Sequence, residues 1–236
     1  MMKTPAKKEM LYEGKAKKVW TTDAPDELVI EYKDDATALN GKRKETIEGK
    51  GLLNNRISNR IFAFLNDQGI PTHFVNEIDE RNAVVRHAEM IPLEVVVRNI
   101  AAGSFSKRLG MTEGQPFQAG IEFHLKNDEL DDPMVSGHDA CFGTGRRIRV
   151  RRIVELALEI DKALSGFFLE HELTLVDFKL EFGRFKIRSS SPTKCLPTPA
   201  ASGMRRSGEK LDKDRFRRNL GNVKEAYEEV ARRLGL

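Results

Sequence analysis

The clearest pattern in this chain is a strict alternation of apolar and charged side chains within residues 173–183. The apolar members are Val176, Phe178, Leu180 and Phe182. The charged members between them are Asp177, Lys179 and Glu181. A period of two predicts a β-strand with one apolar face and one charged face. Same-face residues lie about 6–7 Å apart, so these charges can bracket a charged ligand, although the solvated face of an amphipathic strand also accounts for them.

A second informative run covers residues 91–104. Leu93 to Val97 is strand-like, and Pro92 precedes it. Arg98 follows the strand and leads into a turn of small residues at 101–104. Backbone N–H groups in such a turn can approach an anion, and an arginine offers phosphate or carboxylate a bidentate pair of donors. The run therefore predicts a strand that ends at an anion site.

Spacing along the rest of the chain predicts a mixture of helices and strands. An amphipathic helix is expected over residues 50–67, because apolar residues recur there with helical spacing and Gly69 follows. Further helices are expected at 104–109, 151–170 and 212–234, the last with a break at 219–222. Strands are expected at 11–20, 28–33, 70–76 and 82–90, with Gly14 in a tight turn.

Length and composition bound the architecture. The chain has 236 residues, enough for one large domain or for two lobes that share a cleft, and residues 90–92 are the expected hinge. No apolar run approaches the ~18 residues of a membrane span, and the N-terminus lacks the apolar core of a signal peptide. Cys141 and Cys195 form no disulfide framework. We therefore expect a cytoplasmic protein.

The charge of the chain admits anionic ligands. The formal net charge is +4 and the isoelectric point is about 9.0, which suits nucleic acids or phosphorylated metabolites. The densest basic run, residues 146–152, holds five arginines. Taken alone, that run favours a nucleic-acid-binding module.

Two further motifs point to a family. Residues 11–17 read Leu-Tyr-Glu-Gly-Lys-Ala-Lys, and residues 208–217 read Gly-Glu-Lys-Leu-Asp-Lys-Asp-Arg-Phe-Arg. Together with the two strand runs, and in this order, they resemble the signature segments of the SAICAR synthetase family of purine biosynthesis. The resemblance implies an α+β, two-lobed fold. An antiparallel-sheet lobe at 1–91, similar to the nucleotide-binding lobes of kinases and ATP-grasp enzymes, would bind ATP, and a larger α+β lobe at 92–236 would bind substrate and metal.

The same resemblance implies a reaction. Members of the family are ATP-dependent carbon–nitrogen ligases that join CAIR to L-aspartate, giving SAICAR, ADP and phosphate. Phosphorylation of the CAIR carboxylate gives an acyl phosphate, which the amine of aspartate then attacks. The implied cofactors are ATP and Mg2+, and the implied assembly is a homodimer. No nucleic-acid or membrane partner is expected on this reading.

Roles for individual residues follow from the resemblance. The implied ATP-binding residues are Lys15, Lys17, Met90 and Lys126, with Met90 at the adenine. The implied CAIR-binding residues are Asn40, Arg98, Ser104 and Arg217. The implied catalytic residues are Lys179, Asp177 and Asp214, and Glu181 is the implied magnesium ligand. Without the resemblance, a basic hairpin explains Lys15 and Lys17 equally well, and a surface ion pair explains Asp214 and Arg217.

Residues 188–204 depart from the family pattern. The family has a strand there followed by a motif whose first aspartate is a second magnesium ligand and whose arginine contacts CAIR. Here no aspartate or glutamate occurs between Gly183 and Glu209. Synonymous codons can be chosen that encode this segment as written. Read in a shifted frame, the same bases encode Ile-Val-Leu-Ala-Asp-Glu-Met-Ser-Pro-Asp-Thr-Cys-Arg-Leu-Trp-Asp-Ala. A similar shift over residues 142–150 removes the arginine run.

Two outcomes follow from this departure. If residues 188–205 are translated as written, the alternative function is a catalytically impaired relative that still binds nucleotide. The written segment holds serines and prolines without apolar alternation, so we expect 188–205 to form a poorly packed loop, or a distorted strand.

Overall fold

The computed structural model describes most of the chain. The described residues are 4–38, 43–130, 132–137, 150–185, 194–201, 204–206, 209–211 and 222–236. The chain divides into two compact units, one of residues 1–88 with 210–236 and the other of residues 89–209. The C-terminal residues therefore group with the N-terminal unit, whereas the sequence analysis assigned them to the second lobe. The assignment of ATP and substrate to separate lobes stays a prediction.

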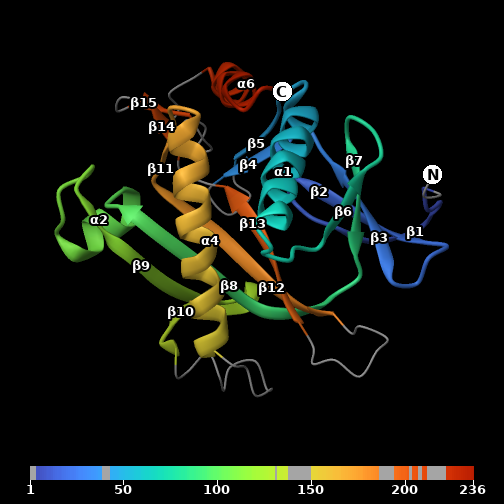
Figure 1. The fold of residues 1–236 in the computed structure, drawn as a ribbon, viewed down its shortest axis with the longest axis horizontal. Helices are drawn as coiled ribbons and strands as arrows, with labels where there is room; N and C mark the ends of the chain where they lie inside the picture. The colour runs from blue at the N-terminus through green and yellow to red at the C-terminus, as the bar shows by residue number, and fades with distance from the viewer. Residues whose placement is uncertain are drawn as a thin grey trace. The chain divides into compact units, whose positions relative to one another are not determined.

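An antiparallel sheet of five strands forms the frame of the first unit (Figure 1). In spatial order its strands are β1 (Lys7–Glu13), β2 (Lys17–Thr22), β3 (Glu27–Tyr32), β7 (Asn82–Arg86) and β6 (Phe74–Glu77). A separate hairpin pairs β4 (Asp35–Ala38) with β5 (Arg43–Thr46). The predicted turn at Gly14 separates β1 from β2, and its amide donates to the Lys17 carbonyl at 2.8 Å.

Helix α1 (Lys50–Asp67) has the bounds that the apolar spacing predicts. Leu53, Ile57, Ile61 and Leu65 recur every fourth residue and are buried, since this spacing lines one face of a helix. The helix packs against β3, β6 and β7, and also against α6 (Val223–Arg233). Of the predicted C-terminal helix, residues 212–221 lie outside the described residues.

The second unit is built on another five-stranded sheet, whose described strand pairings are all antiparallel. Its spatial order is β10 (Met134–Val135), β9 (Pro116–Leu125), β8 (Glu89–Ile100), β12 (Asp177–Phe185) and β13 (Lys194–Ala201). Smaller elements are α2 (Gly103–Leu109), the 3-10 helix η1 (Asp128–Leu130), and a sheet of β11 (Thr174–Leu175), β14 (Met204–Arg206) and β15 (Glu209–Lys210). The α+β class predicted from the sequence is confirmed.

The role of residues 90–92 as a hinge stays a prediction. They lie inside β8, and the two units divide two residues earlier, after Ala88. Pro92 coincides with a register shift, because Glu94 pairs with Glu181 whereas Met90 pairs with Gly183. A strand tolerates proline at such an irregularity, where a ladder hydrogen bond is missing.

Helix α4 (Val150–Glu170) covers the apolar side of this sheet (Figure 1). Its inward residues are those predicted, and all are buried: Ile153, Leu156, Ile160, Leu164, Phe167 and Phe168. The helix contacts β8, β9 and β11, and in β12 the apolar residues Phe178, Leu180 and Phe182 are fully buried. In the part of the chain that the structure describes, no helix combines the length and apolar character needed to cross a membrane.

The prediction that residues 188–205 form a loop is wrong for 194–201, which form β13 in unbroken register with β12 from Phe178 to Phe185. Residues 186–193 lie outside the described residues. Strand pairing uses backbone groups, so an open edge of β12 can accept a segment that lacks apolar alternation. Pro197 and Pro199 are two residues apart on an edge strand, where both nitrogens can face outward without losing a ladder bond.

Candidate functional site

Charged side chains share one face of strands β9, β8 and β12. Residues directly opposite each other on paired strands lie on the same face, and Asp177 is opposite Arg98 while Glu181 is opposite Glu94. On the other side of β8, Glu94 is opposite His124. The apolar alternates of β12 are fully buried on the reverse face. The two-faced strand predicted from residues 173–183 is therefore confirmed.

Arg98 lies at the centre of a network of ion pairs. Its Nε donates to Glu122 Oε2 at 2.7 Å, and its Nη1 donates to Asp177 Oδ2 at 2.8 Å. Arg98 is 14% exposed and Asp177 is 17% exposed, so the charges are largely removed from water. Arg108 of α2 pairs with the second oxygen of Glu122. Such shielded pairs fix the guanidinium orientations strongly.

The end of β8 that carries Arg98 is held by its neighbour Asn99. The Asn99 amide donates to the Val176 carbonyl at 2.8 Å, directly before Asp177. Its side-chain nitrogen donates to Asp161 Oδ1 of α4 at 2.7 Å. Burial raises the pKa of the Asp161 carboxyl, although the Asn99 and Ser165 hydrogen bonds oppose this. The strand end and the helix behind it are thus tied together.

A second set of charges lies further along the same face. The Nζ of Lys179 is 2.5 Å from Glu94 Oε1, and the Nζ of Lys126 is 3.5 Å from Glu181 Oε1. Burial lowers the pKa of Lys126, but the carboxylates of Glu181, Asp132 and Glu94 outweigh it, so the pKa lies above its usual value. Lys126 is therefore cationic near neutral pH, and each of the two lysines lies beside a carboxylate.

Met90 lies at the start of β8, and Ser104 lies in α2, beyond the other end of that strand. Ser104 is exposed in the first turn of α2, five residues beyond Asn99. Met90 is 47% exposed at the start of β8 and pairs with Gly183. The site residues of the second unit thus extend along the sheet from the start of β8 to α2.

The first unit contains a pocket of about 620 Å3 at the β1–β2 turn. Its lining includes Gly14, Lys15, Lys33 and Lys44, together with carboxylates. Lys33 is engaged with Glu13 at 2.7 Å and with Asp35 at 2.6 Å. Lys15 and Lys44 form no ion pair with the described residues. Two ammonium groups are therefore available to an anion in this pocket.

Lys17 does not line that pocket. It begins β2, and its Nζ lies 4.9 Å from the centroid of the Tyr32 ring. The strand expected over residues 11–20 contains both lysines, but Lys15 precedes β2, in the turn. The turn therefore separates the surroundings of the two lysines.

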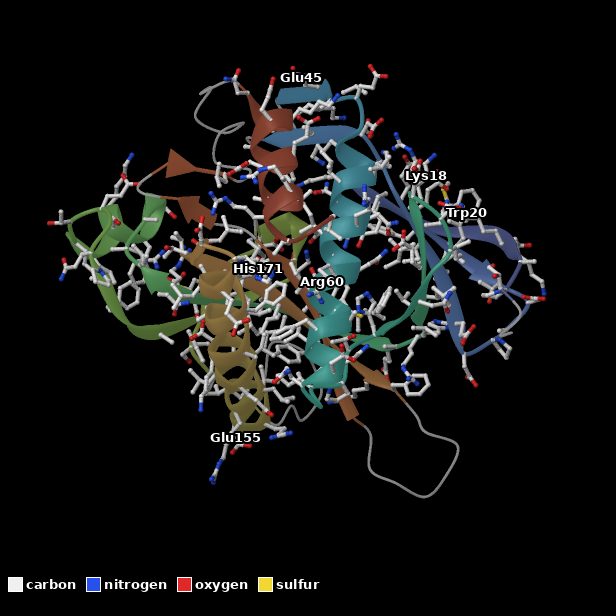
Figure 2. All side chains as sticks on the ribbon, turned by 45° about the horizontal axis from the view of Figure 1, so that its top comes forward. Lys18, Trp20, Glu45, Arg60, Glu155 and His171 are labelled. Atoms are coloured by element: carbon white, nitrogen blue, oxygen red, sulfur yellow. The ribbon has the colours of Figure 1, made fainter. Side chains whose placement is uncertain are left out.

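Three expected site residues lie outside the described residues: Asn40, Asp214 and Arg217. The same holds for residues 138–149, which include most of the arginine run. Of that run, Arg151 and Arg152 begin α4, where both pair with Glu155 at 3.0 and 3.4 Å. Glu155 lies near one end of α4 (Figure 2). These two arginines belong to a solvated helix end.

With this geometry, the chain can be compared with known proteins. A model of the SAICAR synthetase family matches residues 10–234. The chain belongs to this family. Phosphoribosylaminoimidazole-succinocarboxamide synthase of Clostridium botulinum (strain Okra / Type B1) is 46% identical over 230 residues, which cover 97% of this chain and 98% of the relative. The synthase of Novosphingobium aromaticivorans is 48% identical over 237 residues, with 98% and 91% coverage.

Solved SAICAR synthetase structures share the fold. The crystal structure of the Ehrlichia chaffeensis synthase is 43% identical, with a TM-score of 0.89, and covers 96% of this chain and 98% of that one. A SAICAR synthetase in complex with ADP is 38% identical, with a TM-score of 0.87 and coverage of 94% and 96%. The fold class inferred from the resemblance is therefore confirmed.

Among the described residues, the carboxylate of Glu181 is the candidate ligand for the magnesium ion that SAICAR synthetases are expected to use. Mg2+ prefers oxygen ligands and is often held by one or two carboxylates together with substrate phosphates. Glu181 is 41% exposed on the charged face. No cluster of three or more His, Cys, Asp or Glu side chains suited to a metal occurs among the described residues. Glu181 thus suits a site that nucleotide phosphates complete.

Three charged residues of the SAICAR synthetase face were missed from the sequence: Glu94, Glu122 and Arg108. Glu122 was detectable, since Ile121, Phe123 and Leu125 alternate with Glu122 and His124 in the same way as in β12. Glu94 lies in an apolar strand, and the nearest positions on the same face of that strand are uncharged. Its pairing with Lys179 could therefore be recognised only from the strand register.

Proposed function

We propose that this SAICAR synthetase family member is an ATP-dependent ligase that joins CAIR and L-aspartate to give SAICAR, ADP and phosphate. Relatives that carry the synthase name match it along nearly their whole length, and a solved neighbour is described in complex with ADP. The observation that carries the proposal is the charged face of β8 and β12, where Arg98, Asp177 and Lys179 stand together in a chain of this family.

The chemistry needs cations beside two anionic reactants. In the proposed roles, the Arg98 guanidinium and the Ser104 hydroxyl hold CAIR. Lys179 neutralises charge on the CAIR carboxylate while phosphate is transferred, and Glu94 beside it keeps the ammonium in place. Fixed charges aimed at developing charge are the main source of stabilisation in phosphoryl transfer. Asp177 orients Arg98 through the 2.8 Å contact.

Contacts to the nucleotide are proposed for residues of each unit. The pocket that Lys15 and Lys44 line suits ATP phosphates, because both ammonium groups lack an ion pair with described residues. Met90 is the proposed adenine contact, and Lys126 and Lys17 are proposed to contact ATP. Glu181 is the proposed protein ligand of Mg2+, which when bound supplies charge neutralisation at the transferred phosphoryl group. Asn40, Asp214 and Arg217 complete the proposed set.

We further propose a cytoplasmic homodimer whose partners are the small substrates alone, with no nucleic acid or membrane. This part rests on family membership. Light scattering across a concentration series measures the assembly, and a mass of one chain at every concentration would contradict it.

The activity is tested with purified protein, ATP, Mg2+, CAIR and L-aspartate. We expect ADP and phosphate release only when all components are present, together with SAICAR as the product. Turnover that does not depend on aspartate would refute the ligase. The protein is assayed as written and with residues 188–204 replaced by the shifted-frame sequence. ATP binding without turnover in the written form, with turnover in the replaced form, would support the impaired relative for the chain as written.

A further inference from the structure

Glu122 is the most deeply buried carboxylate of the charged face, and the expected roles do not include it. Its side chain on β9 is 9% exposed. Each of its two oxygens accepts from a different arginine: Oε2 from Arg98 of β8, at 2.7 Å, and Oε1 from Arg108 of α2. A buried carboxylate is costly unless it is fully paired. Glu122 therefore bridges two guanidinium groups that come from different elements.

An aromatic ring completes the same arrangement. The guanidinium carbon of Arg98 lies 5.2 Å from the centroid of the Phe105 ring, and that of Arg108 lies 5.7 Å from it. Phe105 itself stacks on Phe117, with ring centroids 5.2 Å apart. Cations over an aromatic face are attracted to it. The ring and the carboxylate together restrain both guanidinium groups.

Both arginines keep donors for a ligand. Arg98 uses Nε and Nη1 for carboxylates, and Arg108 uses Nη2, while a guanidinium carries five N–H donors. The formal charges of two arginines and two carboxylates cancel, so an anion would be held by directed donors rather than by net charge. Arg108 is 38% exposed, which leaves the pair accessible from solvent. Ser104 belongs to the same helix as Arg108.

We propose that Glu122 is a positioning residue that holds Arg98 and Arg108 as a paired guanidinium site for the phosphate of the substrate. The proposal rests on the proposed function for the identity of that substrate. Glu122 does not touch the ligand. It sets the direction of two donors and fixes α2, with its serine, to the sheet. Arg108 is then a second phosphate contact beside Arg98.

The test compares Glu122→Gln with wild type. The amide keeps the size of the side chain but loses the charge. We expect the Kd of CAIR, measured by calorimetry, to rise on the order of tenfold, the scale of one charge-assisted hydrogen bond. The Kd of ATP and kcat at saturating CAIR should stay within about twofold, because the interaction acts on binding. Glu122→Asp, which keeps the charge, should recover part of the loss.

Arg108→Met is a second test of the paired site. It removes one guanidinium group and leaves the buried carboxylate of Glu122 paired with Arg98. It should weaken CAIR binding in the same direction without affecting ATP. The matched control is Glu155→Gln, which also removes a carboxylate that pairs with two arginines, but at the exposed helix end labelled in Figure 2. No change in either Kd is expected there.

Ribose 5-phosphate is titrated in parallel, because it carries the phosphate without the imidazole carboxylate. Weaker binding of this probe by Glu122→Gln and by Arg108→Met supports the paired site even if wild-type protein fails to make SAICAR, so the two proposals can fail separately. An unchanged Kd for CAIR and ribose 5-phosphate in folded variants overturns the positioning role. Equal losses for ATP and CAIR would also overturn it, because they indicate general damage to the fold.

Discussion

The charged face of the second unit and Lys15 of the first unit differ in how their charges are held. In the second unit, Arg98, Asp177 and Lys179 lie on adjacent strands, and each is within 2.8 Å of an oppositely charged group. In the first unit, Lys15 lies in a turn, and it forms no ion pair with described residues. Charges paired across strands are oriented before any ligand arrives, whereas a lysine on a turn can adjust to the ligand. Removing a paired charge should therefore affect both stability and chemistry, and removing an unpaired one should affect binding alone.

Lys179→Met tests the paired side of this comparison and has the largest expected effect. Loss of one cation beside the reacting carboxylate should lower kcat by about 10²- to 10³-fold. It also leaves Glu94, which is 15% exposed, without its ammonium partner, so the free energy of unfolding should fall by about 1–3 kcal/mol. Steady-state kinetics and urea denaturation measure the two effects. Lys162→Met, on an exposed position of α4, should change neither, and a normal kcat in Lys179→Met would contradict the assigned role.

The interior of the first unit holds a buried histidine, His73, which makes the stability of the protein sensitive to pH. Burial, with a smaller contribution from Lys17, lowers the pKa of His73 to about 3. The unfolded chain binds a proton below its ordinary pKa of 6.5 and the folded chain does not, so this stability is present above pH 6.5 and is lost as the pH falls toward 3. The slope should be about 1.4 kcal/mol per pH unit.

His73→Phe should flatten that slope. The phenyl ring can keep the edge contact with Phe62, whose ring centroid lies 4.7 Å away, and it removes an Nδ1 that has no described hydrogen-bond partner. Urea denaturation at pH 7, 6 and 5 measures the difference between variant and wild type. Parallel slopes for wild type and His73→Phe would show that another group controls acid sensitivity.

Lys15→Met tests the unpaired side. Its ammonium lines the pocket without an ion pair to described residues, so the KM of ATP should rise about tenfold, as for loss of one charged hydrogen bond. The unfolding free energy should stay within about 0.5 kcal/mol. Lys18→Met is the control, because Lys18 lies in strand β2 (Figure 2) and its replacement makes the same change in net charge. A large loss of stability in Lys15→Met would show that the two units do not differ as described.

The smallest expected effects concern one buried hydroxyl in each unit. Ser106 of α2 is 6% exposed and its Oγ has no described partner, so Ser106→Ala should change the unfolding free energy by less than about 0.5 kcal/mol. The Thr22 hydroxyl donates toward the Ala24 and Glu27 carbonyls, at 2.8 and 2.9 Å. Thr22→Val should therefore cost about 1 kcal/mol. Equal losses in the two variants would indicate an unseen partner for Ser106.

The sequence predicted those parts of the fold that depend on local periodicity. Helices α1 and α4 and strand β12 each repeat apolar residues at their own period, and each was found with nearly its full bounds. Strand β13 was expected only as a distorted alternative to a loop, because its pairing depends on the open edge of β12 rather than on its own side chains. Pro92, within the expected hinge, lies inside β8, because a strand accommodates a proline where the register shifts.

The site was predicted less completely than the fold. Arg98, Asp177 and Lys179 were selected as candidates because their charges interrupt apolar strands. The structure places them on one face of the sheet, and their roles stay predictions. Glu94 was missed because its partner lies 85 residues away in the chain, a relation that only strand register reveals. The turn that separates Lys15 from Lys17 also depends on backbone geometry, which spacing alone does not give.

The proline spacing in β13 has a consequence for behaviour at high concentration. An outer edge that lacks two N–H donors is a poor template on which a strand from another molecule could grow. The corresponding edge of the first unit, β1, has all its amides, and it exposes Met10, Leu11 and Tyr12 in succession. Lys7 and Lys8 are the charges that discourage intermolecular strand addition there. Aggregation of the folded protein should accordingly begin at β1 and spare β13.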